Sequence, residues 1–179
     1  MKQKILARRY AQATLDSMTS DKYQEILAQV IFMKRFIKKY PKLGEIVRSK
    51  VVRNDSKLEF LDGILGTMEN KEFWMKIFRV MVLKNRSDIM ELFLDEFDNL
   101  LKLKLRIKDV KLVLAHKHDK GTLNHIRGEI ETHLNSKISY ETHIDKSILG
   151  GFIAISDNKT VDASVLTSLM RFARKRVKW

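Results

Sequence analysis

The stretch FDNLLKLKLRIKDVKLVL, residues 97–114, contains the point at which the hydrophobic spacing of this chain changes. Upstream of it, apolar residues recur every three or four positions, as in helices that bury one face. Further along, Leu103, Leu105 and Ile107 alternate with basic residues, which is the spacing of a strand. We therefore predict a mainly α protein, with a helical bundle over residues 1–105 and a small α/β domain over residues 106–179.

Successive segments of the first hundred residues follow the helical spacing. Ser20 or Asp21 can cap the second helix, and Tyr40-Pro41 ends it because a residue before proline is disfavoured in a helix. Residues 73–83 are apolar around nearly the whole circumference, so we expect them to form the central helix, packed on several sides. The predicted buried positions of the other helices are Ala7, Ala11, Leu15, Met18, Tyr23, Ile26, Val30, Met33, Ile37, Leu58, Leu61, Leu65, Met68, Ile89, Phe93, Phe97 and Leu100.

The C-terminal region mixes both spacings. Ser156–Lys159 has the composition of a hairpin turn, and Asp162 or Ser164 can cap a last helix. The expected strands are residues 103–114, 138–144 and 152–155, and the expected first helix of this region is residues 122–135. The predicted core face of the last helix is Leu166, Leu169 or Met170, Ala173 and Val177.

The composition is typical of a protein that folds in water, with 44% apolar and 32% charged residues. Because the chain has no cysteine, disulfides, thiolate metal sites and thiol nucleophiles are excluded. The longest apolar run, Ile148–Ile155, is far shorter than the ~18 residues of a membrane-spanning helix. Residues 1–9 lack the apolar core of a secretory signal. We expect a cytoplasmic setting without direct membrane insertion.

The net charge of +13 is spread along the chain. Residues 1–105 hold 21 basic and 14 acidic side chains, and residues 106–179 hold 14 and 8. A dedicated basic tail would concentrate the excess at one end, so we expect a solvated surface that meets acidic protein partners. The alternative, a basic RNA-binding protein, is favoured by the net charge and by the basic residues between Arg171 and Lys178.

Motifs that carry catalytic chemistry are missing from the sequence. The glycines form neither a phosphate-binding loop nor a dinucleotide-binding turn, and no GxSxG nucleophile motif occurs. His116 and His118 would share one face of a strand, but no HExxH motif or carboxylate at ligand spacing accompanies them. Asp95, Glu96 and Asp98 are interpreted as the solvated side of a helix. We predict no catalytic residue, no metal site and no cofactor.

Four short segments resemble one known family. They are Ala7-Arg8-Arg9-Tyr10-Ala11, Lys84-Asn85-Arg86, Asp145-Lys146-Ser147-Ile148-Leu149-Gly150-Gly151-Phe152 and Asp162-Ala163-Ser164-Val165. In order and spacing they resemble the R-Y-A, N-x-R, D-P-S-L-I-G-G and D-G-S-V signatures of the delta subunit of F-type ATP synthases, whose mitochondrial counterpart is the oligomycin-sensitivity-conferring protein. Lys146 and Ala163 depart from the usual proline and glycine, and residues 114–123 lack the usual signals.

The resemblance implies a non-catalytic stator subunit, present once per complex. An N-terminal six-helix bundle would grip the N-terminal helices of alpha subunits on the catalytic head, and a C-terminal domain would join the b subunits of the peripheral stalk. The head would then be held still while the rotor turns, so that proton flow is coupled to ATP synthesis. This implies a peripheral membrane protein on the cytoplasmic face of a bacterial plasma membrane, without nucleic acid or cofactor.

The resemblance also indicates residues for these roles. The alpha-subunit helix would lie between the first and fifth helices, as an amphipathic helix lies in an apolar groove. The candidate contact residues are Ala7, Tyr10, Ala11, Thr14, Leu15, Ile77, Val80, Met81 and Lys84. The alternative for each of them is that it packs the bundle itself. Structural roles are expected for Asn85, Arg86, Gly150, Gly151, Asp162 and Ser164.

Overall fold

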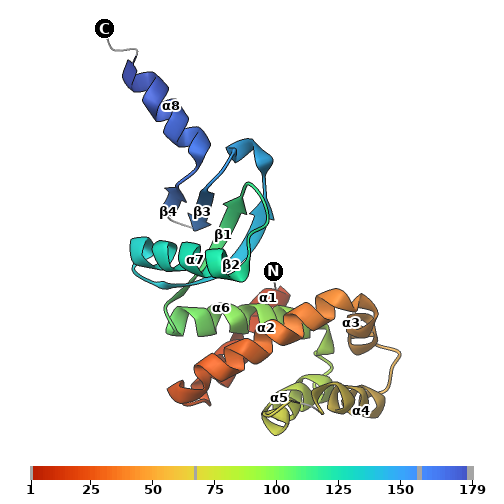
Figure 1. Ribbon diagram of the computed structural model, residues 1–179. Coiled ribbons are helices and arrows are strands. Elements are labelled where there is room, and N and C mark those ends of the chain that lie inside the picture. Colours follow the sequence, from red (N-terminus) through yellow and green to blue (C-terminus); the bar gives the residue numbers. More distant parts are fainter. Residues whose placement is uncertain (1, 67, 157–158, 177–179) are drawn as a thin grey trace. The chain divides into compact units, whose positions relative to one another are not determined.

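The computed structural model describes residues 2–66, 68–156 and 159–176 of this chain, with side chains up to Ala173 in the last helix. It is mainly helical with one four-stranded sheet, which confirms the mainly α fold class (Figure 1). The chain divides into two compact units, Met1–Leu105 and Arg106–Trp179. Asp157, Asn158 and Val177, to which the sequence assigned a turn and a core position, lie outside the described residues.

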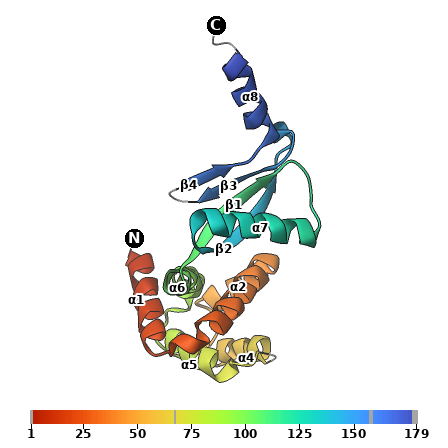
Figure 2. The same cartoon turned by 60° about the vertical axis from the view of Figure 1, so that its left-hand side comes forward.

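The N-terminal unit is built around helix α6. Its close packing partners are α1 and α2, while α4 and α5 pack on each other; Figure 2 shows α6 end-on between α1 and α2. The elements are α1 (Lys2–Asp16), α2 (Tyr23–Lys39), α3 (Pro41–Arg48), α4 (Asn54–Leu65), α5 (Lys71–Leu83) and α6 (Met90–Lys104), with 3-10 turns at Ser20–Lys22 and Ser87–Ile89.

The central helix of this unit is α6, not the predicted segment 73–83. Phe93 and Phe97 of α6 are fully buried and contact the rings of Phe78 and Trp74. Helix α5 buries one face only, because it packs against α4 and α6 and leaves its far side open: Val80 is 48% exposed and Leu83 is 58% exposed. The apolar residues around α5 therefore do not mark a helix that is covered on all sides. Some of them lie on a side of the helix that is exposed.

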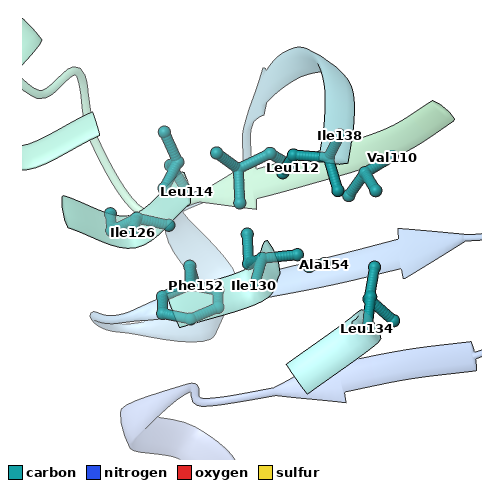
Figure 3. Close-up of a cluster of buried hydrophobic side chains, with 9 residues drawn as sticks. All are labelled: Val110, Leu112, Leu114, Ile126, Ile130, Leu134, Ile138, Phe152 and Ala154. Carbon is teal, nitrogen blue, oxygen red and sulfur yellow. The ribbon is translucent and has the colours of Figure 1, made fainter. Parts of the chain in front are cut away.

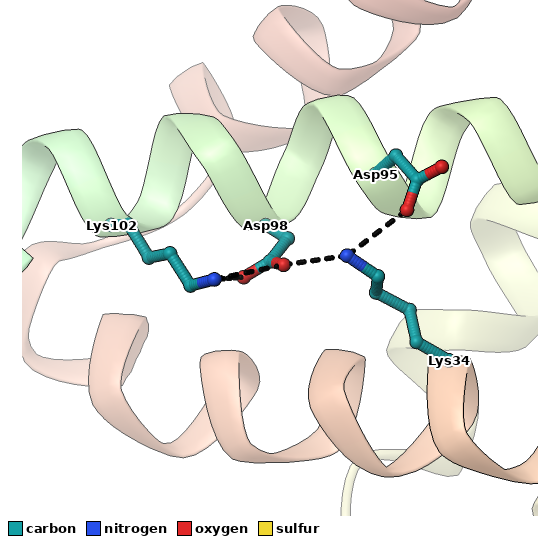
Figure 4. A network of polar contacts seen from close by, with 4 residues as sticks. All are labelled: Lys34, Asp95, Asp98 and Lys102. Carbon is teal, nitrogen blue, oxygen red and sulfur yellow. Dashed lines mark hydrogen bonds and ion pairs between the residues drawn. The ribbon is translucent and has the colours of Figure 1, made fainter. Parts of the chain in front are cut away.

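The carboxylates of α6 also differ from the prediction. Asp95 is exposed, but Glu96 and Asp98 are buried. Lys34 of α2 lies 2.7 Å from one oxygen of Asp98 and 3.0 Å from Asp95, and Lys102 lies 3.1 Å from Asp98 (Figure 4). These two carboxylates can be buried because cations on α1, α2 and α6 itself replace the water that they lose; for Glu96 the cation is Lys4 of α1, at 3.6 Å.

The change from helix to strand lies slightly later in the chain than the sequence indicated. Helix α6 continues to Lys104, and strand β1 (Ile107–Leu114) begins only after Arg106, which has a positive φ of 54°. Leu103 is 74% exposed on the helix rather than part of a strand. Lys102 and Lys104 favour this extension because basic residues in a last turn interact well with the helix dipole.

The C-terminal unit is a four-stranded sheet with the order β2-β1-β3-β4. Strands β1 and β2 (Lys137–Ile144) are parallel, joined by α7 (Lys120–Leu134), and β3 (Phe152–Ser156) and β4 (Lys159–Asp162) pair antiparallel. Helix α7 covers one face of the sheet, as Figure 3 shows. The buried cluster between them consists of Val110, Leu112, Leu114, Ile126, Ile130, Leu134, Ile138, Phe152 and Ala154.

Helix α8 (Val165–Arg176) follows the last strand, but its apolar residues do not form the predicted core face. Leu169, Met170 and Ala173 are exposed, and Leu166 is half-buried. Helix α8 contacts the 3-10 turn Lys146–Ile148, and its first residue, Val165, donates its N–H to Gly150. Figure 1 shows the helix extending away from the sheet. The apolar face is therefore open rather than internal.

Candidate partner-binding surfaces

Five of the nine predicted contact residues are buried within the N-terminal unit. Ala7 and Ala11 are fully buried on the side of α1 that packs on α6, and their small side chains allow the two helices to approach closely. Buried with them are Thr14, Leu15 and Met81. In the chain alone these residues have the packing role that was the alternative for each of them.

The other four candidates reach the surface. Tyr10 and Ile77 are half-buried, and Val80 and Lys84 are exposed. On α1, residues three and four apart lie on the same side of the helix, so Leu6, Tyr10 and Ala13 form one flank beside the buried face.

The matching flank of α5 lies on the side away from α4. Lys71 Nζ of α5 pairs with Asp62 of α4 at 2.8 Å, and Val80 follows Lys71 by about two and a half helical turns, which places it on the opposite side of the helix. Within the part of the chain that the structure describes, α1 and α5 are not a closely packed pair. We call the two flanks together the α1–α5 surface: Leu6, Tyr10, Ala13, Phe73, Ile77, Val80 and Lys84.

Sequence reasoning did not identify Leu6, Ala13 or Phe73. A signal was present in α1: the positions on the other side of the buried stripe, Arg8 and Gln12, are polar, whereas the Tyr10 side is apolar. The apolar stripe of α1 is therefore wider than the contact with α6 requires.

Two of the segments quoted from the sequence, residues 7–11 and 84–86, meet in the structure. Arg86 Nη1 donates a hydrogen bond to Tyr10 Oη at 2.9 Å. The guanidinium carbon of Arg86 also lies 5.7 Å from the centroid of the Tyr10 ring. This pair of contacts connects α1 to the turn that follows α5.

Asn85 sets the backbone of this turn. Its φ is 53°, in the left-handed region that asparagine tolerates better than most residues. The N–H of Arg86 donates to the carbonyl of Met81 at 2.8 Å, and the N–H of Asn85 donates to Val82 at 2.9 Å. These two bonds are the usual pattern of a helix end with a left-handed residue, and they fix Arg86 to the last turn of α5.

In the C-terminal unit, Gly150 and Gly151 lie against the start of α8. The N–H of Val165 donates to the carbonyl of Gly150 at 3.0 Å, and that of Ala163 donates to Phe152 at 2.9 Å. Gly151 has a φ of 73°, and a Cβ there would lie 2.2 Å from the carbonyl oxygen of Ala163. The two glycines thus let the backbone before α8 bond directly to the sheet.

Asp162 and Ser164 cap α8. The Asp162 carboxylate accepts the N–H of Ser164 at 2.9 Å and the hydroxyl of Thr167 at 2.8 Å, and Ser164 Oγ accepts the N–H of Thr167 at 3.2 Å. The hydrogen bonds from Ser164 and Thr167 hold the pKa of Asp162 below its ordinary value. The start of α8 is therefore fixed while its remaining turns lie open.

The apolar side of α8 is the second candidate surface. Phe172 is 71% exposed, while the polar Thr167, Ser168 and Arg171 occupy the other side of the helix. We call the apolar side the α8 face: Val165, Leu166, Leu169, Met170 and Phe172.

A further candidate among the described residues is a metal site. The described ranges contain no cluster of three or more histidine or carboxylate side chains able to hold a metal ion. The rings of His116 and His118 lie 4.4 Å apart on the loop after β1, without a third ligand from the described residues. Among the described helices, none has both the length and the apolar composition that crossing a membrane requires.

Comparisons with known proteins agree with one another. The family model described as ATP synthase delta (OSCP) subunit matches residues 6–175. The chain is 26% identical to ATP synthase subunit delta of Caldanaerobacter subterraneus subsp. tengcongensis, over 98% of this chain and 99% of that protein. It is 23% identical to the Rickettsia bellii protein of the same name, over 97% of this chain and 93% of the relative.

A solved structure shows the same fold. A chain in the cryo-EM structure of the Toxoplasma gondii mitochondrial ATP synthase hexamer aligns with a TM-score of 0.67 at 16% identity, covering 97% of this chain and 98% of that one. None of these comparisons favours the RNA-binding alternative. The match of the family model to nearly the whole chain shows that this protein belongs to the ATP synthase delta (OSCP) subunit family, the non-catalytic stalk subunits of that membrane-associated complex.

Proposed function

We propose that this chain is the stator connector between the catalytic head of ATP synthase and its membrane-anchored b subunits. In this proposal residues 1–105 are the family's six-helix bundle and bind the N-terminal helix of an alpha subunit, and residues 106–179 bind the b subunits. One copy serves each complex. The observation that carries the proposal is the pair of open apolar surfaces, one in each unit of a chain whose family is the delta subunit.

The α1–α5 surface supports the alpha-subunit contact. Its two apolar flanks belong to helices that are not closely packed on each other within the described residues, and exposed Val80 lies on one of them. An amphipathic partner helix would bury its apolar side between such flanks, with Lys84 at the polar rim. The contact would make no covalent bond, and its contribution is binding free energy that resists the torque of the rotor.

The test of this contact is a titration of the full chain with a peptide of the alpha-subunit N-terminal helix. V80E should weaken binding by about tenfold or more, because it places a charge within the apolar contact. Q24E is the matched control, since Gln24 is exposed on α2 and the change adds the same charge. Absence of binding by the unmodified chain at about 500 µM peptide would contradict the proposal.

The α8 face supports the contact with the b subunits. A helix of 12 residues is marginal in water without tertiary packing, and a contiguous exposed apolar face is typical of an interaction site. Arg171 on the other side would favour a partner with acidic flanking residues.

The corresponding experiment measures binding of the full chain to the C-terminal segment of the b subunit. L169E should reduce the affinity by about tenfold. T160E, which adds the same charge to an exposed position of β4, should leave the affinity unchanged. Equal binding by L169E and the unmodified chain would move the contact away from α8.

The location that we propose is the cytoplasmic face of a bacterial plasma membrane, held there by protein contacts. High salt or urea should then release the chain from washed membranes without detergent, together with the catalytic head. Retention of the chain after both washes would contradict peripheral attachment.

A further inference from the structure

We infer that Arg86 is a positioning residue of the α1–α5 surface: it sets the separation of α1 from the end of α5, and so the width available to a partner helix. This inference adds to the proposed alpha-subunit contact, and the effect of Arg86 on partner binding depends on that proposal. Its structural consequence, the separation of the two helices, is testable without any partner.

The backbone of Arg86 lies in the turn after α5 and is bonded to the last turn of that helix. Its N–H bonds to the carbonyl of Met81 at 2.8 Å, and the left-handed Asn85 directs the chain out of the helix immediately before it. Movement of the last turn of α5 therefore carries Arg86 with it.

The side chain of Arg86 contacts α1. It bonds to Tyr10 Oη at 2.9 Å and lies over the Tyr10 ring at 5.7 Å. Tyr10 is a member of the α1–α5 surface, one helical turn from both Leu6 and Ala13. The contact thus joins the two flanks at a residue that the partner would touch.

Other contacts connect the two helices through neighbouring elements. Gln3 Nε2 donates to Asp88 at 3.0 Å, which connects α1 to the 3-10 turn Ser87–Ile89 rather than to α5. Helix α1 packs on α6, and α5 packs on α4 and, through Trp74 and Phe78, on α6. Both helices thus share α6 as a support, and the contact of Arg86 with Tyr10 joins α1 directly to the turn after α5.

The chemistry of the bridge is specific to arginine. A planar guanidinium can donate to the phenol oxygen and lie over the ring at the same time, whereas a lysine ammonium is a point charge on a flexible stem. Since both side chains reach solvent, the contact contributes little to the stability of the fold. Its loss should therefore affect partner binding more than unfolding.

The first experiment measures the helix separation in the full chain. Because the chain has no cysteine, single cysteines at exposed Arg8 of α1 and Lys76 of α5 can carry spin labels for pulsed electron paramagnetic resonance. The distance distribution should broaden in R86K and stay narrow in R79K, which makes the same exchange at an exposed site on another side of α5. An unchanged distribution in R86K overturns the inference.

The second experiment is a double-mutant cycle with the alpha-subunit peptide. R86K and Y10F should each weaken binding about 3- to 10-fold, and the double variant should be no weaker than the poorer single variant. R79K should bind as the unmodified chain does, and the melting temperature of R86K should match that of R79K.

The outcomes separate the two proposals. An unmodified chain that does not bind the peptide overturns the proposed alpha-subunit contact, while the label distances still decide the role of Arg86. If the unmodified chain binds and R86K binds equally well, the positioning role is overturned and the contact stands. A loss of binding in R86K that follows a matching loss of thermal stability shows a purely structural role, which also overturns the inference.

Discussion

Gly151 has a backbone conformation and a neighbour that both exclude a side chain. Its φ of 73° is unfavourable for other residues, and a Cβ would lie 2.2 Å from the carbonyl oxygen of Ala163. The contact is between two backbone segments, so no side chain can move aside to relieve it.

G151A should therefore lower the free energy of unfolding of the C-terminal unit by about 3 kcal/mol. The matched control is G128A in the middle of α7, where a Cβ meets nothing within 4 Å. This control should raise stability by up to ~1 kcal/mol, because alanine favours a helix over glycine. Urea unfolding of both variants is the measurement, and equal effects would contradict the role of Gly151.

The pair formed by Lys34 and Asp98 leads to a second prediction at this scale. Burial lowers the pKa of Lys34, but hydrogen bonds to Asp98 and Asp95 raise it by more, so that the pKa lies above its ordinary value. D98N should cost about 2 kcal/mol of stability, since it replaces the buried carboxylate between Lys34 and Lys102 by a neutral amide and leaves Lys34 with the exposed Asp95. D95N, at an exposed position, should cost less than ~1 kcal/mol.

The pH dependence of this pair follows from the direction of the shift. A raised lysine pKa adds stability that is complete below the unfolded value of 10.5 and is lost as the pH rises through the folded value. The stability difference between the unmodified chain and D98N should stay constant from about pH 6 to pH 9 and shrink above about pH 10.5. Chemical unfolding across that range measures it, and a difference that grows with alkaline pH would contradict the assignment.

At the scale of elements, helix α8 has a first turn held by capping hydrogen bonds and later turns that are exposed. Its first turn is capped by Ser164 and Asp162, whereas Leu169, Met170 and Phe172 of the α8 face are exposed. Such a helix should open locally at low free energy.

Hydrogen exchange of the full chain should therefore be fast in α8 beyond its first turn, with an opening free energy of about 0–1 kcal/mol. Helix α7 is the internal control, because Ile126, Ile130 and Leu134 are buried against the sheet. Adding the b-subunit segment should slow exchange in α8 alone. Exchange in α8 as slow as in α7, without a partner, would contradict the open face.

The existence of most elements could be predicted from spacing, since the stripes at Val30, Phe93 and Ile130 mark buried faces that the structure contains. The spacing of apolar residues could not show which element, if any, packs on each apolar face. Residues 73–83 and 165–176 both showed apolar patterns, and only the packing shows that each helix leaves such residues open. The buried Glu96 and Asp98 were missed because Lys4 of α1 and Lys34 of α2, which pair with them, lie far away in sequence.

The candidate surfaces were predictable only in part. Tyr10, Ile77, Val80 and Lys84 reach the surface, whereas the α1 candidates Ala7, Ala11, Thr14 and Leu15 are buried in the chain alone. The meeting of Tyr10 with Arg86 could not be derived from spacing, because it depends on how α1 and α5 lie on α6.

At the scale of the whole molecule, the division after Leu105 predicts independent folding of the N-terminal unit. A fragment of residues 1–105 should unfold cooperatively with an enthalpy of about 60–80 kcal/mol near its midpoint. A fragment of residues 1–89 should not, because it lacks the central helix α6. Differential scanning calorimetry distinguishes them, and a broad, non-cooperative transition for 1–105 would contradict independent folding.

The strand order of the C-terminal sheet has a consequence for synthesis. Strand β1 lies between β2 and β3, yet it leaves the ribosome before either of them. At ~5–20 residues per second, roughly 30 residues must be added before β2 is complete and roughly 40 before β3 is complete. Strand β1 therefore waits about 1.5–6 s with both hydrogen-bonding edges unpaired and about 2–8 s until it can pair with β3. An unpaired apolar strand is a template for aggregation, so the nascent C-terminal unit is the part of this chain that most needs protection by a chaperone.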